Sequence, residues 1–347
     1  MSDIVVSDIE EILTADLPWH RFADKNILVT GAAGMLPFYM VETLLSLDRV
    51  GIRRPRKVVG LVRSLDRARS RFVHRARDSV LDLVSHDISV PWPGTEGFDF
   101  IVHAASQASP KFYSTDPVGT MLANCLGTTW LLDKAKQDGS EGFLFFSSGE
   151  VYGVTSKVPT AEGDYGYLDP TNVRSCYGEA KRASETMCVS WAHQYGVPSF
   201  IVRPFHAYGP GMALDDGRVF ADFVRDIVER RDIVMKSDGS TLRPFCYITD
   251  ATVGFFTVLL KGQPATPYNV GNEEAELSIL ELAEMLVRVF PTPPLRVIRA
   301  VRSSDDKYLP SPVFRNLPDT ARLRGLGWQP TVSAEEGFRR TVLSFST

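Results

Sequence analysis

Residues 26–37 read NILVTGAAGMLP, and this stretch decides the fold. An apolar strand pattern runs into Gly31 and Gly34, and an apolar helical pattern follows. Such a loop holds pyrophosphate when glycines let backbone N–H groups approach it and a helix N-terminus adds orphan donors. A strand, a glycine turn and a helix also form an ordinary structural corner. The stretch alone therefore predicts a βα unit and leaves two interpretations of its loop.

Pro37 occupies the place where the third glycine of a dinucleotide loop is expected. In the first turn of a helix the backbone N–H groups have no intrahelical partner, so a proline does not break a helix there. Its ring is bulkier than glycine, and it pushes Leu36 away from helical geometry. We expect a slightly displaced or widened first turn, with pyrophosphate still gripped by residues 31–36.

The alternation of strands and helices continues beyond this loop. Apolar runs that read as strands lie at 56–63, 98–105, 142–148 and 199–205, and helical patterns lie near 119–137 and 176–195. Strands that are apolar on both faces and alternate with helices indicate a parallel sheet covered on both sides. The predicted fold class is α/β, a doubly wound parallel sheet of the Rossmann type, with a smaller mixed α/β C-terminal region.

Three parts follow from this rhythm. Residues 1–21 form an N-terminal extension with one amphipathic turn, residues 22–205 form the dinucleotide-binding Rossmann domain with the catalytic helix, and residues 206–347 form mainly the substrate-binding region. No low-complexity linker separates the last two parts. We therefore expect them to pack together, with a ligand cleft at the carboxyl ends of the strands.

Composition excludes several classes of protein. The 347 residues are 44% hydrophobic and 23% charged, and a net charge of −4 provides no field to attract nucleic acid or an anionic membrane. Four cysteines without a C-x-x-C pair indicate neither a zinc site nor a disulfide framework. The N-terminus is acidic, and no window approaches the 18 apolar residues of a membrane span. We expect a cytoplasmic protein without a metal, a nucleic-acid partner or a membrane partner.

Two further features can carry chemistry. Tyr177 and Lys181 stand four residues apart on a predicted helix, so both project from one face, and an ammonium can stabilise a tyrosine phenolate. Ser147, Ser148 and Glu150 follow the strand pattern GFLFF at 142–146, where a hydroxyl can bind a sugar oxygen and a carboxylate can move a proton. A solvated lysine beside an interface tyrosine, and serines that cap local backbone, are the structural alternatives.

Together these features resemble the extended short-chain dehydrogenase/reductase family that modifies nucleotide sugars. The resemblance spans residues 26–337, and it is closest to the UDP-glucuronate decarboxylases and more distant from the dTDP-glucose 4,6-dehydratases. The stretches that carry it are HAASQASPKFYSTDP, RSCYGEAKRASE, YGPGMALDDGRVFADFV, DGSTLRPFCYITD and LGWQPTVSAEEGF. This set is much more specific than the glycine loop alone.

The resemblance implies a set of catalytic roles. Tyr177 removes the proton of the sugar C4 hydroxyl, Lys181 holds the nicotinamide ribose, and Ser148 polarises the C4 oxygen. Glu150 serves proton transfer at C5 once C4 is a ketone. Dehydratases carry an aspartate and decarboxylases usually a hydroxyl at the position of Gly149. This departure disfavours dehydration and leaves the second step of the reaction open.

The resemblance also implies a tightly bound NAD or NADP and a nucleotide-diphosphate sugar. The cofactor-binding residues would be Gly31, Ala33, Gly34, Met35, Leu36, Arg63, Ser64, Asp87, Ile88, Ala104, Ala105, Ser106, Tyr177, Lys181 and Pro204. Because Val62 replaces the acidic residue of NAD-preferring relatives and Arg63 can hold a 2'-phosphate, the sequence leans to NADP. The substrate-binding residues would be Ser109, Lys111, Tyr113, Glu150, Arg174, His206, Arg218, Arg243 and Arg315.

Several alternatives stay open at this point. The same C4 oxidation serves a nucleotide-sugar dehydrogenase, epimerase or dehydratase, and a catalytically silent nucleotide sensor can retain the same fold. Lys111 pairs with a substrate carboxylate or phosphate, or is a solvated loop lysine. The resemblance further implies a homodimer that pairs through the helices near 119–137 and 176–195.

Overall fold

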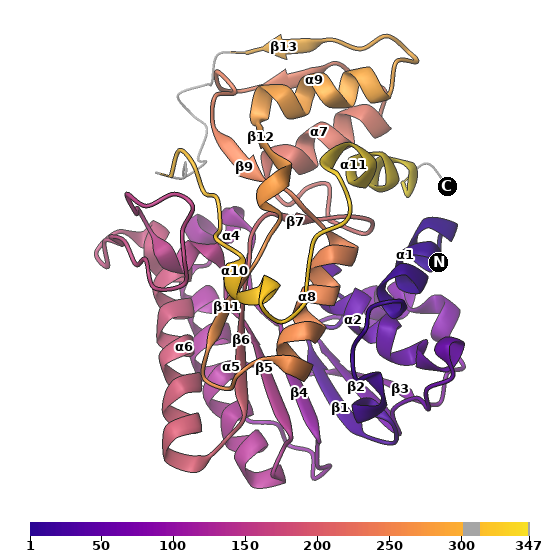
Figure 1. Ribbon diagram of the computed structural model, residues 1–347, viewed down its shortest axis with the longest axis vertical. Helices are drawn as coiled ribbons and strands as arrows, with labels where there is room; N and C mark the ends of the chain where they lie inside the picture. The colour runs from indigo at the N-terminus through magenta and orange to yellow at the C-terminus, as the bar shows by residue number, and fades with distance from the viewer. Residues whose placement is uncertain (301–312, 346–347) are drawn as a thin grey trace.

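The computed structural model describes residues 1–300 and 313–345, and its centre is a seven-stranded parallel sheet (Figure 1). The strand order is β11-β6-β5-β4-β1-β2-β3. The strands are β1 (Asn26–Thr30), β2 (Lys57–Val62), β3 (Leu81–Ser85), β4 (Phe100–His103), β5 (Gly142–Phe146), β6 (Ser199–Pro204) and β11 (Pro267–Val270). Ile27 of β1 pairs with Val58 on one side and with Phe100 on the other. The direction of winding therefore reverses between β1 and β4, the switch point at which such sheets bind ligands.

Helices cover both faces of this sheet. Leu28 packs with α5 (Pro117–Asp138) and α6 (Cys176–Tyr195), while its neighbours Ile27 and Val29 join the core formed with α2 (Met35–Leu45) and α8 (Ile248–Lys261). The short helix α3 (Leu65–Arg71) follows β2. Adjacent residues of one strand are thus buried on opposite faces, which confirms the doubly wound prediction.

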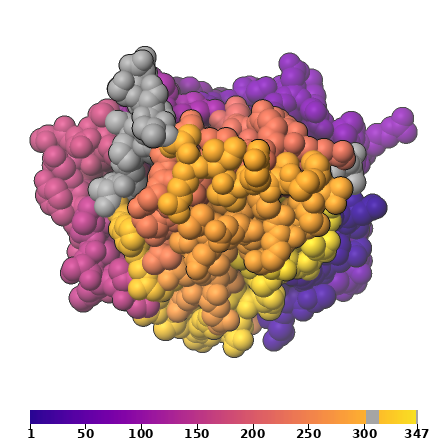
Figure 2. Space-filling model, turned by 90° about the horizontal axis from the view of Figure 1, so that it is seen from above, coloured from indigo at the N-terminus to yellow at the C-terminus, as the bar shows by residue number. Residues whose placement is uncertain are grey.

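The C-terminal region lies above the sheet in Figure 1, and it covers most of the face seen in Figure 2. Its helices are α7 (Val219–Val228), α9 (Ile279–Val289), α10 (Ala321–Arg324) and α11 (Ala334–Leu343). Its strands pair two by two, as β7 (Ala207–Tyr208) with β10 (Cys246–Tyr247), β9 (Leu242–Pro244) with β12 (Glu276–Ser278), and β8 (Ile233–Met235) with β13 (Val297–Arg299).

The sheet does not end at residue 205. The chain returns through α8, and β11 adds to the edge of the sheet with Tyr268 opposite Val202 of β6. The expected substrate-binding region, residues 206–347, therefore contributes one helix and one strand to the dinucleotide-binding layer. This interleaving fixes the position of the C-terminal region over the sheet.

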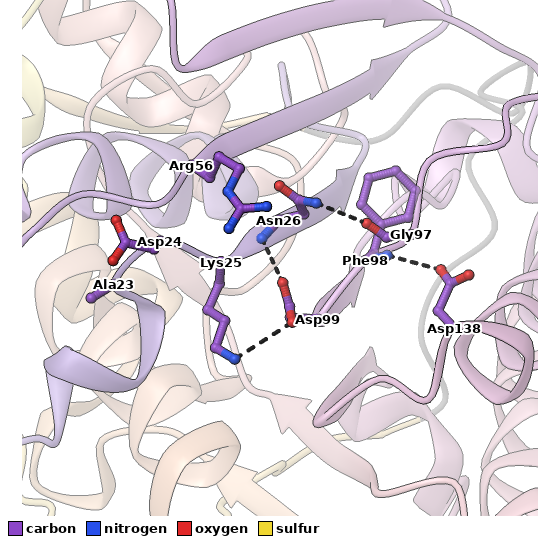
Figure 3. A pocket seen from close by; sticks show the side chains of 9 residues that line it. All are labelled: Ala23, Asp24, Lys25, Asn26, Arg56, Gly97, Phe98, Asp99 and Asp138. Carbon is purple, nitrogen blue, oxygen red and sulfur yellow. Dashed lines mark hydrogen bonds and ion pairs between the residues drawn. The ribbon is translucent and has the colours of Figure 1, made fainter.

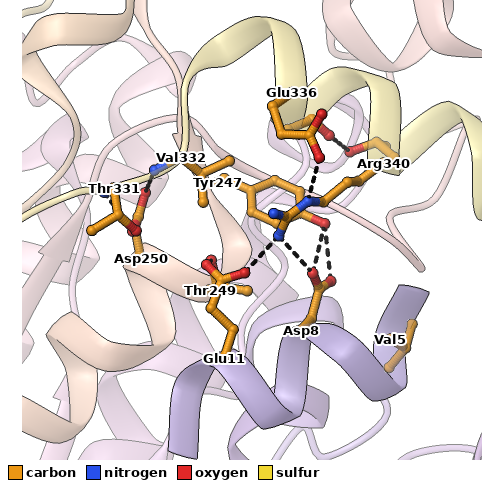
Figure 4. A network of polar contacts seen from close by, with 12 residues as sticks. Val5, Asp8, Glu11, Tyr247, Thr249, Asp250, Thr331, Val332, Glu336 and Arg340 are labelled. Carbon is orange, nitrogen blue, oxygen red and sulfur yellow. Dashed lines mark hydrogen bonds and ion pairs between the residues drawn. The ribbon is translucent and has the colours of Figure 1, made fainter. Parts of the chain in front are cut away.

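The N-terminal extension is a longer helix than the single turn expected from the sequence. Helix α1 (Asp3–Leu13) spans 11 residues, is capped by Ser2, and packs against α2 and α8. Its buried Asp8 accepts a hydrogen bond from Tyr39 of α2 at 2.7 Å. Asp8 also accepts from Tyr247 of β10 at 2.9 Å and contacts Arg340 of α11 at 3.3 Å (Figure 4). Helix α1 therefore joins the Rossmann layer to the C-terminal region.

A cavity of about 420 Å³ opens at the amino ends of β1 and β4 (Figure 3). Its polar groups contact one another: Asp99 accepts from the Asn26 N–H at 2.7 Å and pairs with Lys25 at 3.5 Å, while Asp138 accepts from the Phe98 N–H at 2.9 Å. These contacts tie the starts of two neighbouring strands together. The cavity lies at the end of the sheet opposite to the glycine loop.

None of the helices described has the length and apolar character that a membrane crossing requires.

Candidate active site

The glycine loop joins β1 to α2, and its geometry depends on Gly31. This residue has φ +69°, and a Cβ atom added to it would lie 2.9 Å from Ala105 Cα. Thr30 Oγ1 accepts hydrogen bonds from the N–H groups of Ala104 and Ala105 at 3.2 and 3.0 Å. The ends of β1 and β4 are thereby held side by side, and a side chain at Gly31 would force them apart.

Pro37 lies in the first turn of α2, as expected. Gly34 is the N-cap, Met35 is the first helical residue, and the Phe38 N–H donates to Gly34 O at an ordinary 3.0 Å. The expected widening of the turn is absent at this hydrogen bond. Because the first-turn N–H groups have no intrahelical partner, Pro37 costs the helix no hydrogen bond, and the loop still offers donors to an anion.

The described residues around this loop fit a dinucleotide. Ser106 Oγ is buried without a hydrogen-bond partner among the described residues, next to the close approach of Gly31 and Ala105. Ser64 caps α3, and Arg63 beside it is exposed at the end of β2. Asp87 accepts from the Ser89 N–H at 2.9 Å, and Ile88 packs on Gly127 of α5. Pro204 ends β6 in register with Val270.

Tyr177 and Lys181 lie at the start of α6, and both are buried. Burial raises the pKa of Tyr177 to about 12, and a hydrogen bond with Ser148 opposes that rise. The Lys181 ammonium donates to Phe146 O at 2.5 Å and lies 5.6 Å from the centre of the Tyr177 ring. Burial lowers the pKa of Lys181 to about 7. Its charge at neutral pH is therefore sensitive to any anion that binds nearby.

Ser148 and Glu150 follow β5 on a short turn of 3-10 helix, Gly149–Tyr152. Ser148 Oγ accepts from the Glu150 N–H at 3.2 Å, so the hydroxyl that contacts Tyr177 also orients the backbone that carries Glu150. A Cβ atom at Gly149 would lie 2.8 Å from Cε1 of Phe205. The ring of Phe205 thus fills the space that an aspartate or a hydroxyl would need.

A wall of stacked side chains borders Tyr177. The ring of Tyr113 stacks on that of Tyr177 at 5.1 Å and 17°, and the guanidinium of Arg174 lies 5.1 Å from the centre of the Tyr113 ring. Arg174 Nη1 donates to Glu150 Oε2 at 3.0 Å. Four predicted site residues from three separate segments therefore meet in one place.

Arg218 and Arg243 form the cationic side of the site, and His206 lies near both. Burial, followed by Arg243 and Arg218, lowers the pKa of His206 well below its ordinary value, so the imidazole is neutral. His206 has φ +40°, and its Nδ1 has no partner among the described residues. Arg218 Nε donates to Asp216 at 2.7 Å, and Arg243 donates to the carbonyls of residues 242, 313 and 314 at 2.7 to 2.9 Å.

The remaining predicted substrate residues lie at the rim. Ser109 Oγ donates to Asp216 O, and Lys111 Nζ donates to Asp215 O at 3.1 Å. Arg315 makes a forked ion pair with Glu276 of β12 at 2.7 to 3.1 Å, and its backbone pairs with Leu242, the neighbour of Arg243. Ser109 and Lys111 thus join the loop that carries Arg218, whereas Arg315 lies next to the β9–β12 strand pair that carries Arg243.

Sequence reasoning missed a buried network behind the site. Arg203 is fully buried and makes a forked pair with Glu185 of α6, which also accepts from Ser147 Oγ at 2.5 Å. Arg203 also donates to Tyr152 OH at 2.7 Å, and Tyr152 donates to Asn269 of β11. Ser147 therefore has a structural contact, but with a side chain of α6 and not with the local backbone. Only the unusual arginine in the apolar strand at 199–205 signalled this network.

The fold and this site define a class of protein, the Rossmann-type enzymes that pair a tyrosine and a lysine at a dinucleotide loop. Residues 27–271 match the NAD dependent epimerase/dehydratase family. The chain belongs to this family. It is an enzyme of the type that uses a nicotinamide dinucleotide to modify nucleotide sugars, as the sequence predicted.

Relatives and solved structures agree with this placement. UDP-glucuronic acid decarboxylase 1 of Arabidopsis thaliana is 33% identical over 92% of this chain and 69% of its own length. The zebrafish (Danio rerio) protein of the same name is 32% identical over 98% and 78%. The epimerase Mth375 of Methanothermobacter thermautotrophicus superposes with a TM-score of 0.80 at 23% identity, covering 98% and 95%. UDP-glucuronic acid 4-epimerase of Bacillus cereus was solved with UDP-glucuronic acid and NAD. It superposes with a TM-score of 0.77 at 22% identity, over 92% of this chain and 99% of its own.

Proposed function

We propose that this protein decarboxylates UDP-glucuronate after oxidising the sugar at C4. The observation that carries the proposal is the meeting of Tyr177, Ser148 and Glu150 beside Lys181 at the carboxyl ends of β5 and β6. The similarity to UDP-glucuronic acid decarboxylases over most of the chain supports the choice of substrate.

Tyr177 acts first in the proposed reaction. Its phenolic oxygen takes the proton of the C4 hydroxyl, and Ser148 hydrogen-bonds the same oxygen region and favours the ionised tyrosine. When bound, the nicotinamide accepts the C4 hydride and later returns it. Lys181 supplies a positive charge 5.6 Å from the Tyr177 ring, which stabilises the phenolate because both side chains are buried.

Glu150 is placed for the second step. With a ketone at C4, the carboxylate on C5 becomes that of a β-keto acid. The bond between C5 and the carboxylate then breaks and carbon dioxide leaves. The electron pair of that bond forms the enolate of the C4 ketone. A proton then replaces the carboxylate at C5, and Glu150 serves this proton transfer. Dehydration would need a second acid at Gly149, where Phe205 fills the space.

Turnover of UDP-glucuronate tests the proposal. Purified protein with cofactor should release carbon dioxide and a UDP-pentose, and Tyr177→Phe should lower the rate by about 10²- to 10⁴-fold. Oxidation without carbon dioxide would favour the alternative, a C4 dehydrogenase, epimerase or dehydratase. No nicotinamide reduction with any UDP-hexose or UDP-uronate would favour a silent nucleotide-binding protein.

The cofactor preference is a finer proposal. Val62 is buried and carries no carboxylate, whereas Arg63 is exposed and can pair with a 2'-phosphate, which supports NADP over NAD. Hydrogen bonds from Ser89 hold the pKa of Asp87 below its usual value, and the charge of Arg63 adds to this effect. Titration calorimetry with both cofactors on wild type and Arg63→Ala tests this. Tighter NAD binding that the substitution does not change would contradict it.

The oligomeric state is also proposed, as a homodimer through α5 and α6. These helices pack together and expose apolar side chains, namely Val118, Met121, Leu122 and Leu126 of α5 and Val189 of α6, each 38 to 66% exposed. Exposed apolar side chains gathered on two packed helices are typical of a protein interface. Light scattering should give a dimer for wild type and a monomer for Leu122→Glu with Leu126→Glu. A wild-type monomer would contradict this proposal.

A further inference from the structure

Glu150 forms an ion pair with Arg174. Arg174 comes from the short turn Val173–Ser175 just before α6, and its Nη1 lies 3.0 Å from Glu150 Oε2. The Arg174 side chain is 14% exposed and that of Glu150 35%. The contact lies beside the stacked rings of Tyr113 and Tyr177, so it faces the place assigned to the sugar.

A uronate substrate brings a second carboxylate to this place. Burial raises the pKa of Tyr177, and the negative charge of Glu150 raises it further, so the site already opposes additional negative charge. Two carboxylates close to each other beside buried groups repel each other unless a cation lies between them. A cation that contacts Glu150 directly is the group best placed to offset this repulsion.

Arg174 meets this requirement better than the other nearby cations. A guanidinium presents five N–H donors in a planar fork and can serve two carboxylates at once. Lys111 is 44% exposed and turned to Asp215, and Arg218 is engaged by Asp216. Arg174 is more buried than either, and it already holds the carboxylate that acts at C5.

We propose that Arg174 is a specificity-determining residue, which Glu150 shares with the C6 carboxylate of the substrate, so that the site selects a uronic acid over a neutral hexose. This inference rests on the proposed function. On binding, the sugar carboxylate accepts some of the Arg174 N–H hydrogen bonds that Glu150 accepts in the free protein. The carboxylate of Glu150 then has one donor fewer and becomes a better proton acceptor.

Binding of UDP-glucuronate and UDP-glucose to the cofactor-loaded protein tests this inference. Tyr177→Phe is the parent variant, because it slows turnover during titration calorimetry. We expect this parent to bind UDP-glucuronate at least tenfold more tightly than UDP-glucose. Adding Arg174→Gln should bring that ratio close to one and change the Kd for UDP-glucose less than threefold. Adding Lys111→Met is the matched control and should preserve the ratio.

A second variant separates recognition from a structural role. Adding Glu150→Gln removes one of the competing carboxylates, so the preference for UDP-glucuronate should increase. An unchanged ratio in Arg174→Gln, including an equal loss of both ligands, would overturn the inference and leave the proposed function intact. A parent without any preference for the uronate would instead count against the proposed substrate itself.

Discussion

Asp8 provides a test of how the N-terminal helix is held. Its carboxyl is fully buried, and burial raises its pKa from 3.8 to about 6, although hydrogen bonds from Tyr39 and Tyr247 and the charge of Arg340 act in the opposite direction. Glu11 of the same helix adds to the rise. A raised pKa means that the folded protein binds this proton more tightly than the unfolded chain does. Asp8 therefore stabilises the fold most at low pH, and this contribution is lost as pH rises through 6.

The size of the effect follows from the two pKa values. Because a tenfold change in proton affinity corresponds to about 1.4 kcal/mol, full ionisation of Asp8 costs the fold about 3 kcal/mol. Between pH 7.5 and pH 5.0 the linkage relation gives about 1.4 kcal/mol of the total. Asp8→Asn keeps the shape of the side chain and cannot ionise. Its free energy of unfolding should lack this pH-dependent increment.

Urea denaturation of wild type and Asp8→Asn at several pH values measures the difference. All other titrating groups are common to both proteins, so the change in the difference between pH 7.5 and pH 5.0 isolates Asp8. Asp250, also buried with its pKa raised to about 6, makes Asp250→Asn a positive control with the same sign. Stability curves of wild type and Asp8→Asn that run parallel across this range would refute the reasoning.

Three further predictions concern the site. Lys181→Met should slow C4 oxidation by at least about 10²-fold and move its rise with pH to more alkaline values, measured by nicotinamide absorbance, since the phenolate loses its nearby cation. Gly149→Ala should lower the free energy of unfolding by about 1 to 3 kcal/mol in urea melts, because its Cβ would lie 2.8 Å from Phe205. Pro37→Gly should leave cofactor binding largely intact in calorimetry, whereas Gly31→Ala should abolish it; binding that appears only in Pro37→Gly would contradict this.

The sequence predicted the strands that local apolar pattern defines. The run at 199–205 corresponds to β6 (Ser199–Pro204), and the run at 56–63 to β2 (Lys57–Val62). Residues 267–270 fall within the predicted C-terminal region, but they form β11, which pairs with β6 at the edge of the main sheet. Local pattern indicates that a segment is extended, whereas its partner depends on a contact between distant segments. A sheet edge formed after a long excursion is therefore not readable from periodicity.

The candidate site divides in the same way. Tyr177 and Lys181 were predictable because helical spacing fixes their relative placement, and Ser148 and Glu150 because they follow a strand. The sequence did not predict which carboxylate each cation contacts. Arg340 meets Asp8 across 332 residues of sequence, and Arg174 meets Glu150 across 24. Such pairs depend on side-chain direction after the elements have packed, which no residue pattern in one segment contains.

These pairings determine how an anionic substrate can bind. Glu150 pairs with Arg174, Asp216 with Arg218, and Asp215 with Lys111, so each of these cations contacts a carboxylate before a ligand binds. A nucleotide-diphosphate sugar must therefore compete with protein carboxylates at each point, and a ligand without matching anions gains little from entering. Desolvation strengthens the ion pairs within the protein as well as those with the ligand. The net free energy of binding therefore depends on how well the ligand anions fit the cations, and not on charge attraction alone. Selectivity in this site consequently arises from the exchange of partners, and Arg174 is the position where that exchange alters the chemistry.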